Sequence, residues 1–313
     1  MSDPTTSADD GDSFEIDSAT LEIIRNGCAA IAEEMNANLI RTGYSPNVKE
    51  RRDCSCALFD AAGEMISQAE NMPVHLGAMP FSVAAAIEEF PPETLEPGDG
   101  ILLNDPFRGG AHLPDLTLVT PVFATSDASC ASASSGESSE PRDGEIVAFA
   151  ANRAHHADVG GSSAGSVAAD STEIYQEGVR IPPIKFYESG EINETAMDLV
   201  LANVRTPEER RGDLRAQEAA NQTGRQRFGA LVEKYGTEYL RAAIEEIKDY
   251  SERRMRAEIE ALADGTYRFE DVLDDDGRGN TDLPVVAEVT IEGDRYRRQA
   301  RRSRRAFVAP SSL

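Results

Sequence analysis

The stretch EIVAFAANRAHHADVGG, residues 145–161, decides the fold. It contains a strand-like apolar run that ends at two adjacent histidines. A second strand-like run, LPDLTLVTPVF, precedes it at 113–123. The residues between the two runs, 124–144, are rich in Ser and Ala and show no apolar period, which is typical of a surface loop. We therefore predict that the two runs pair as a hairpin whose strands are joined by a flexible loop at 124–144.

Regular elements are expected on both sides of this hairpin. Apolar residues at three- and four-residue steps predict one amphipathic helix over 18–43, with Ser18 or Thr20 as its N-cap. A charged, periodic region over 206–263 predicts a second helical segment, broken near Gly236. Short strand-like runs complete the chain at 54–67, 99–107 and 266–294. The predicted fold class is α+β, with mixed short strands, an N-terminal helix and a long helical segment around 206–263.

The charge balance restricts the possible partners. The chain has 56 acidic and 31 basic residues and a net charge of -25, and only four of the basic residues are lysines. A surface this acidic disfavours nucleic acid, whose phosphates need a basic face. We interpret the acidic, lysine-poor composition as an adaptation to a high-salt cytoplasm. An acidic protein of an ordinary cytoplasm remains the alternative.

The chain shows no signal for a membrane or for export. No run approaches the roughly 18–20 apolar residues that span a bilayer. The first residues, 1–17, are acidic and polar and lack the apolar core of a secretory signal, so they are expected to form a disordered tail. A cytoplasmic protein without a membrane partner is the prediction.

Histidine and aspartate residues flank the predicted hairpin in a pattern that can hold a metal ion. His112 and Asp115 stand three residues apart around Pro114, and His155 and His156 end the second strand. Successive strand residues point to opposite faces, so one of the two adjacent histidines can face the first motif. With Asp158, the open end of the hairpin would gather two histidines and one or two carboxylates. Mixed nitrogen and oxygen ligation with open positions is expected of a catalytic Zn, Mn or Fe site. A His–Asp hydrogen bond that only stabilises the loop is the alternative.

Other polar residues near these motifs have less specific interpretations. His75, in MPVHLGAM, either hydrogen-bonds a metal ligand or is a satisfied core histidine. The Arg51, Arg52 and Asp53 group is either a surface ion-pair cluster or part of the site. The irregular segment 171–190 carries charged residues that could bind a ligand, namely Glu173, Glu177, Arg180 and Lys185.

Phosphate-binding motifs are missing from the sequence. The chain contains no GxxxxGK[ST] loop and no GxGxxG after a strand. We therefore do not expect this chain alone to bind and split ATP.

Five motifs, in order, resemble the hydantoinase B/5-oxoprolinase family, which includes a large subunit of acetone and acetophenone carboxylases. They are ERRDCSCALFDAAGEMISQAENMPVHLGAM, GDGILLNDPFRGGAHLPDLTLVTPVF, FAANRAHHADVGG, EIYQEGVRIPPIKFYESGEI and NVRTPEERRGDLRAQEAA. The resemblance implies the B subunit of an ATP-dependent N-methylhydantoinase or 5-oxoprolinase. Such a subunit opens a small cyclic amide, and an A-type subunit uses the ATP.

The same resemblance implies roles for individual residues. The carboxylase relatives bind a metal through a His, an Asp three residues later and a downstream His, which correspond here to His112, Asp115 and His155. His156 is the neighbouring alternative for the last ligand. Asp158 or His156 is then expected to orient a ligand or to move a proton during catalysis.

The chain departs from the family at its end. Family members are considerably longer, and residues 294–313 form an arginine-rich stretch where further family motifs are expected. We expect a family domain over 18–293, an aberrant basic tail over 294–313, and a truncated or frameshifted B subunit. The alternatives are a carboxylase-type subunit and an inactive chain that acts only as an assembly partner.

Overall fold

The computed structural model describes residues 16–69, 71–124, 144–166, 170–277 and 279–302. Most of the expected acidic tail and nearly all of the expected flexible loop at 124–144 lie outside these residues. Within the described part, six α-helices and ten strands confirm the α+β class. No helix in that part is long and apolar enough to cross a membrane.

The central hairpin is present. Strand β4 (Asp115–Phe123) pairs antiparallel with β5 (Ile146–His155), in a register that places Asp115 opposite His155. Five further strands extend this hairpin into a seven-stranded sheet of order β2-β1-β5-β4-β3-β6-β7. They are β1 (Cys54–Asp60), β2 (Met65–Gln68), β3 (Gly100–Leu103), β6 (Ile184–Glu188) and β7 (Glu191–Ile192). The sequence analysis missed β6 and β7, which lie in a segment punctuated by Gly and Pro.

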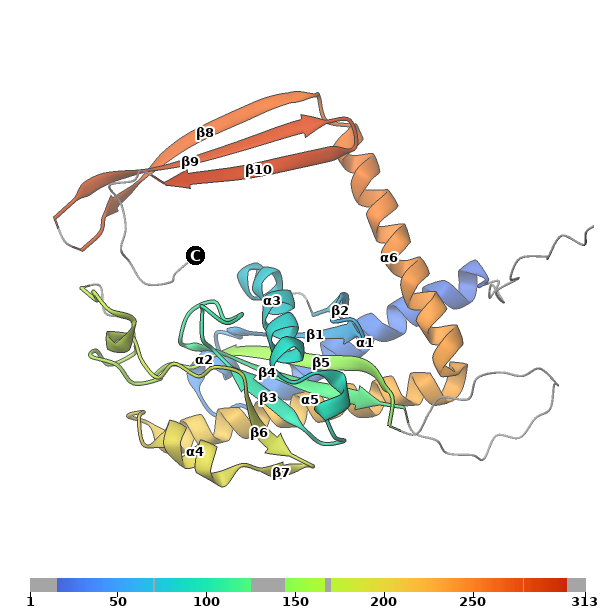
Figure 1. Cartoon of the computed structure of the whole chain (residues 1–313), viewed down its shortest axis with the longest axis horizontal. Coiled ribbons are helices and arrows are strands. Elements are labelled where there is room, and N and C mark those ends of the chain that lie inside the picture. The colour runs from blue at the N-terminus through green and yellow to red at the C-terminus, as the bar shows by residue number, and fades with distance from the viewer. Residues whose placement is uncertain (1–15, 70, 125–143, 167–169, 278, 303–313) are drawn as a thin grey trace, which may run out of the picture.

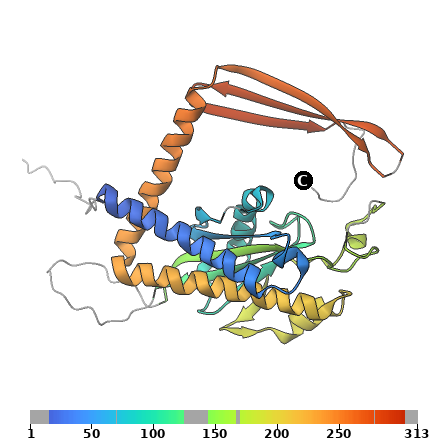
Figure 2. The ribbon, with the colours of Figure 1, turned by 180° about the vertical axis from the view of Figure 1, so that it is seen from behind.

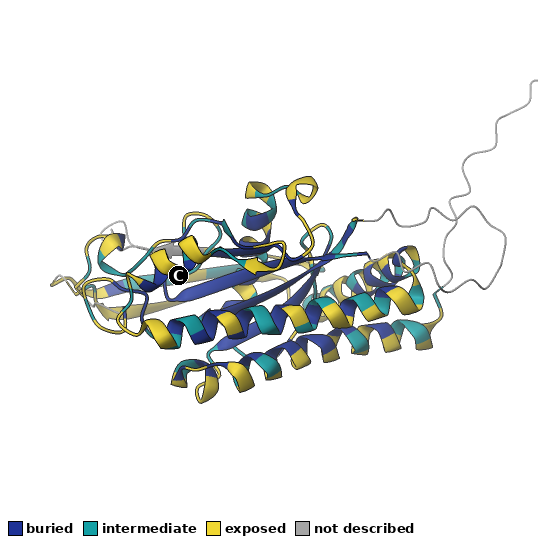
Figure 3. Ribbon diagram, turned by 90° about the horizontal axis from the view of Figure 1, so that it is seen from below, coloured by how far each residue is buried: buried dark blue, intermediate teal, exposed yellow. Residues whose placement is uncertain are grey.

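Helices cover both faces of this sheet (Figures 1 and 2). Long helices α1 (Ser18–Thr42) and α5 (Pro207–Tyr235) lie side by side on one face, and α3 (Pro73–Glu89) lies on the other. Figure 3 shows the strands buried and the outer sides of the helices exposed. Two short helices, α2 (Pro46–Lys49) and α4 (Glu194–Leu201), also belong to this part of the molecule. We call the seven-stranded sheet and the helices around it the body.

The alternation of β5 separates the two cores. Ala148, Ala150 and Ala154 pack toward α1 and α5, whereas Phe149 and Ala151 pack toward α3. Side chains of one strand alternate between faces, so this separation also fixes which way the residues at the end of β5 point.

The N-cap of the first helix lies one residue before the nearer of the two predicted caps, Ser18. Asp17 is the N-cap of α1, and its side chain accepts hydrogen bonds from the backbone N–H groups of Ala19 and Thr20 at 3.0 Å. The expectation of Ser18 or Thr20 as cap is therefore wrong. A carboxylate at this position satisfies free N–H groups and interacts favourably with the helix dipole.

A second, three-stranded sheet lies apart from the body, at the end of α6 (Thr237–Glu260), as Figure 1 shows. Its order is β10-β9-β8, and all pairs are antiparallel. The strands are β8 (Gly265–Asp275), β9 (Thr281–Glu292) and β10 (Arg295–Arg302), and we call this sheet the arm. Strand β10 comes from the arginine-rich stretch in which the sequence indicated no strand. The expected break near Gly236 is confirmed, because Gly236 separates α5 from α6.

Helix α5 also carries a buried carboxyl group, Glu218. One of its oxygens is buried and has no hydrogen-bond partner among the described residues. Burial raises its pKa to about 7, and the charge of Arg225 offsets this only in part. Burying a carboxylate without a partner is costly, so the protonated form is favoured in the folded state.

Replacing this carboxyl group should change how stability depends on pH. The folded protein keeps the Glu218 proton to a higher pH than the unfolded chain, so this group lowers stability as pH rises from about 4.5 to about 7. Glu218→Gln removes the penalty and should stabilise the fold by about 1–3 kcal/mol at pH 8, with little change near pH 4.5. Urea unfolding at both pH values measures this. An equal effect at both would contradict the assignment.

Candidate metal site

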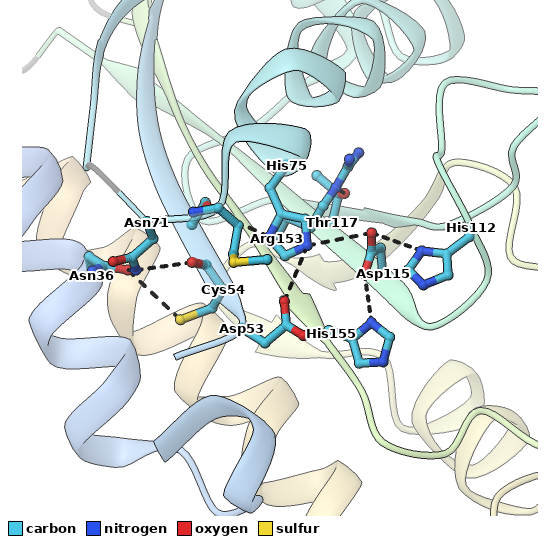
Figure 4. Close-up of polar contacts among 12 residues, drawn as sticks. Asn36, Asp53, Cys54, Asn71, His75, His112, Asp115, Thr117, Arg153 and His155 are labelled. Carbon is cyan, nitrogen blue, oxygen red and sulfur yellow. Dashed lines mark hydrogen bonds and ion pairs between the residues drawn. The ribbon is translucent and has the colours of Figure 1, made fainter. Parts of the chain in front are cut away.

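Asp115 is the centre of a cluster of imidazoles at the end of the central hairpin (Figure 4). Its Oδ2 lies 2.9 Å from Nδ1 of His112, and its Oδ1 lies 3.1 Å from Nδ1 of His155. The two imidazole rings are 5.1 Å apart between centroids. One potential ligand atom from each of the three residues lies within 4.8 Å of the others. The structure thus brings together the three residues that the sequence analysis selected as metal ligands.

The loop before β4 holds His112 in place. Gly109 has a φ of 85°, and a Cβ on Gly110 would lie 2.2 Å from the carbonyl oxygen of Asn104, so both positions need glycine. The Ser82 hydroxyl on α3 donates to the Gly109 carbonyl at 2.5 Å. A short turn then closes from Asp115 N–H to the His112 carbonyl at 3.0 Å. These contacts bring the imidazole back over the first residue of the strand.

The third imidazole comes from α3. His75 is buried, and its Nε2 lies between two carboxylates, 3.6 Å from Oδ2 of Asp115 and 3.5 Å from Oδ1 of Asp53. Its Nδ1 lies 3.5 Å from the Ser55 hydroxyl. Of the two interpretations left open for His75, contact with a ligand residue matches this geometry. Asp53 likewise contacts the cluster through His75.

The histidines keep Asp115 ionised. Burial by itself would raise the pKa of this carboxyl group, but hydrogen bonds from His112, His155 and His75 outweigh burial and hold the pKa well below its usual range. A carboxylate that stays charged in a buried position is a strong ligand for a divalent cation.

A buried arginine that the sequence analysis missed lies beside this cluster. Arg153 is fully buried, and it donates to Thr117 Oγ1 at 2.8 Å and to Ser82 Oγ at 2.7 Å. Its third nitrogen, Nη1, has no hydrogen-bond partner among the described residues. Arg153 precedes His155 by two positions, so the period of the strand could have placed both on one face. Through Ser82, Arg153 is connected to the loop that carries His112.

His156 points to the opposite face of the sheet. It is buried against α5, where its Nε2 donates to Gln217 at 2.9 Å. Burial and the nearby charge of Arg210 lower its pKa to about 4, so this imidazole is neutral near pH 7. Its backbone N–H donates to the Pro114 carbonyl at 2.8 Å, which fastens the end of β5 to the residue before Asp115.

A buried ion pair on α5 lies near His156. Asp213 accepts from Arg210 Nη2 at 3.1 Å and from the backbone N–H groups of Tyr44 and Ser45 at 2.7 and 3.0 Å. Both charged side chains are fully buried, and Arg210 retains two nitrogens without a partner among the described residues.

Asp158 has its contacts in the turn that follows β5. Its carboxylate accepts from the backbone N–H groups of Gly160, Gly165 and Arg205, and it forms an ion pair with the Arg205 guanidinium at 2.8 Å. The expectation that it lies beside Asp115 does not match these contacts. The backbone N–H groups of the turn and the Arg205 guanidinium hold this carboxylate, so proximity in sequence does not bring Asp158 into the cluster.

The irregular segment 171–190 lies beside the His112 loop. Asn104 connects the two, because its side-chain amide donates to the carbonyls of Leu113 and Val179 at 2.7 and 2.9 Å. Arg180 lies over the rings of Phe107 and Tyr175, with 5.9 and 5.7 Å to their centroids. Lys185, in contrast, pairs with Asp99 at 2.8 Å.

Glu177, in the same segment, interacts electrostatically with His112. Burial raises the pKa of Glu177, and the charge of His112 acts in the opposite direction. The charge of the cluster therefore influences the pKa of one carboxyl group in the irregular segment.

Comparisons with known proteins agree with the fold and the motifs. The family model described as hydantoinase B/oxoprolinase matches residues 17–308. Caprolactamase subunit beta of Pseudomonas jessenii is 34% identical over 279 residues, which cover 89% of this chain and 45% of the relative. The crystal structure of the ATP-dependent caprolactamase from the same organism has a TM-score of 0.82 at 32% identity, covering 92% of this chain and 47% of that one.

An acetone carboxylase structure has a similar fold. Its TM-score is 0.73 at 19% identity, and the match covers 88% of this chain and 37% of that one. In each of these comparisons the chain spans less than half of the other protein. The family match, which covers nearly all of the chain, shows that the chain belongs to the hydantoinase B/oxoprolinase family.

Proposed function

We propose that the chain acts in the B subunit of an ATP-dependent amidohydrolase that opens a small cyclic amide. An A-type subunit would use the ATP, because this chain contains none of the common phosphate-binding motifs. The likeness to caprolactamase subunit beta supports a cyclic amide as the substrate class. The observation that carries the proposal is the His112, Asp115 and His155 cluster at the exposed end of the central hairpin.

The three residues suit a divalent metal ion. Two imidazoles and one ionised carboxylate form a mixed nitrogen and oxygen donor set, which fits Zn, Mn or Fe. The side chain of His112 is 33% exposed and that of His155 is 19% exposed, so water and substrate can reach the donors, whereas that of Asp115 is 3% exposed. A bound metal ion would polarise the amide carbonyl or lower the pKa of a water molecule.

Residues around the cluster have supporting roles in this proposal. The buried His75 contacts the Asp115 carboxylate and would help to hold it in place, as residues around a metal ligand commonly do. His156 orients His155 indirectly, because its ring and its backbone N–H fasten the strand end on both sides. Asp158 holds the following turn through Arg205. We therefore favour positioning over proton transfer for His156 and Asp158.

A reconstitution experiment tests the function. The chain is combined with the A-type subunit of caprolactamase, ATP and Mn²⁺ or Zn²⁺, and ring opening of caprolactam, hydantoin and 5-oxoproline is followed together with ADP release. His112→Ala should abolish turnover, at least about 100-fold below wild type, while circular dichroism and the melting temperature change little, because the imidazole is partly exposed.

The control is Asp198→Asn on α4, whose carboxylate is 75% exposed and should not affect turnover. Full activity of His112→Ala would exclude the site. Carboxylation of acetone by bicarbonate in place of ring opening would support the carboxylase alternative, and no reaction by a folded, metal-loaded complex would support the assembly-partner alternative.

A further inference from the structure

The arm has two chemically different faces, as its strand register shows. Residues directly opposite each other in antiparallel strands share a face. The pairs Phe269–Ala287, Leu273–Leu283 and Tyr296–Ile291 all lie on one side. We call this side the apolar arm face, and its apolar members are Tyr267, Phe269, Leu273, Leu283, Val285, Ala287, Val289, Ile291 and Tyr296.

The other face of the arm is polar. Thr266 lies opposite Thr290 and shares a hydrogen bond of 3.1 Å with it, and Arg268 lies opposite Glu288. When a sheet has one apolar and one polar face, a second layer of structure normally covers the apolar face. The polar face is the side that is suited to water.

In the described part of the chain, much of the apolar arm face is uncovered. Leu283 and Ile291 on the central strand are buried, whereas the aromatic side chains of the outer strands are exposed. Phe269 is 71% exposed, Tyr296 is 60% exposed and Tyr267 is 50% exposed. None of the three hydrophobic clusters that the described residues form includes an arm side chain. Figures 1 and 2 show the arm joined to the body through α6 and standing clear of the main sheet.

An exposed apolar surface of this kind marks a binding surface. Contiguous apolar patches are rare on monomeric proteins, and aromatic side chains are enriched at the centres of interfaces. The arm offers three aromatic side chains on one face, and the sheet is too thin to bury them by itself.

We propose that the apolar arm face docks a polypeptide equivalent to the part of the caprolactamase beta subunit that this chain does not match. The match to the solved caprolactamase covers 92% of this chain and therefore extends into the arm, because residues 265–313 make up more than the remaining 8%. The same match covers only 47% of the caprolactamase chain. More than half of that chain is therefore available to form the second layer, whether it is joined to this chain or separate from it.

The charges on the apolar arm face define the chemistry of the partner. Asp271 lies on the β8 side, and Arg298 lies on the β10 side, opposite Val289. The docking segment should therefore have an apolar centre, with basic side chains toward β8 and acidic side chains toward β10. A second copy of this chain would match the same charges only if its β10 lay over β8 of the first copy. Binding of a second copy is a separate outcome of the test. The proposal does not depend on the metal site.

Copurification tests the proposal. The chain is tagged and coexpressed with the unmatched segment of Pseudomonas jessenii caprolactamase subunit beta. The matched segment of that subunit, tagged in the same way, is the positive control. The amount of the unmatched segment that it captures is the reference level. Light scattering gives the stoichiometry of each complex. We expect a one-to-one complex with the wild-type chain.

Two substitutions on β8 separate the faces. Phe269→Asp, on the apolar arm face, should weaken capture at least about tenfold. Val272→Asp is the matched control, because Val272 is 50% exposed on the same strand but points to the polar face, and it should capture as well as wild type. Both sites are exposed, so neither change should unfold the protein.

Three results would overturn the proposal. One is failure of the wild-type chain to capture the segment that the caprolactamase control captures. Another is an equal effect of Phe269→Asp and Val272→Asp. The third is a homodimer of the chain that Phe269→Asp dissolves, which would assign the face to a second copy.

Discussion

Asp115→Asn is expected to lower the affinity of the protein for Mn²⁺ or Zn²⁺ by more than about 100-fold. Loss of an outer hydrogen-bond partner of a metal ligand alone typically costs about 10–100-fold, and Asp115 is the charged group around which His112, His155 and His75 all lie. The amide keeps the shape of the side chain but removes its charge. Elemental analysis after dialysis and competition with a chelating dye measure the effect.

Asp53→Asn is the matched control for this substitution. The Asp53 carboxylate pairs with His75 and not with any of the three proposed metal ligands. Its replacement should therefore lower the affinity for the metal ion by no more than about tenfold. If Asp115→Asn retained as much metal as wild type, the imidazoles would contact Asp115 for structural reasons alone, and the metal mechanism would have to be abandoned.

Asp213→Ala is expected to destabilise the fold by about 3–5 kcal/mol, because it removes the buried counter-charge of the Arg210 guanidinium and leaves that group with the half-exposed Glu209. The same substitution removes the acceptor of the Tyr44 and Ser45 backbone N–H groups. Urea unfolding at pH 7 gives the free energy directly, provided that the slope of the transition stays unchanged.

Glu209→Ala is the control for the buried pair. Glu209 contacts the same guanidinium at 3.3 Å, but its side chain is 46% exposed, so its loss should cost less than about 1 kcal/mol. Similar losses in the two variants would show that water reaches Arg210 and that its ion pair with Asp213 is not a buried one.

The hairpin and its ligands could be predicted because they depend on local rules. Strand alternation indicates that His155 and His156 point to opposite faces, and hairpin pairing brings the start of β4 to the end of β5. The same rules do not say which face carries which helix. The choice between His155 and His156 therefore depended on the resemblance.

The remainder of the cluster depends on packing between distant segments. His75 reaches Asp115 from α3, and Asp53 reaches His75 from the residue before β1. No spacing in the sequence indicates either contact. Arg153 was overlooked because a charged residue within an apolar strand is usually taken for an edge or surface position, whereas here its hydrogen bonds to Ser82 and Thr117 allow its burial. Asp158 was misplaced for the opposite reason, since proximity in sequence was taken for proximity in space.

The register of β4 against β5 also has a consequence for insertions and deletions. Asp115 lies opposite His155, so deletion of a single residue from β5 before Arg153 would place His156 opposite Asp115 and turn His155 to the face that α1 and α5 cover. The doubled histidine would thus still supply an imidazole to the cluster. Arg153, however, would turn away from Ser82 and Thr117 and toward the apolar core beneath α1 and α5. The length of β5 is therefore fixed by its arginine rather than by its histidines, and libraries of single-residue deletions should tolerate changes after His156 better than changes before Arg153.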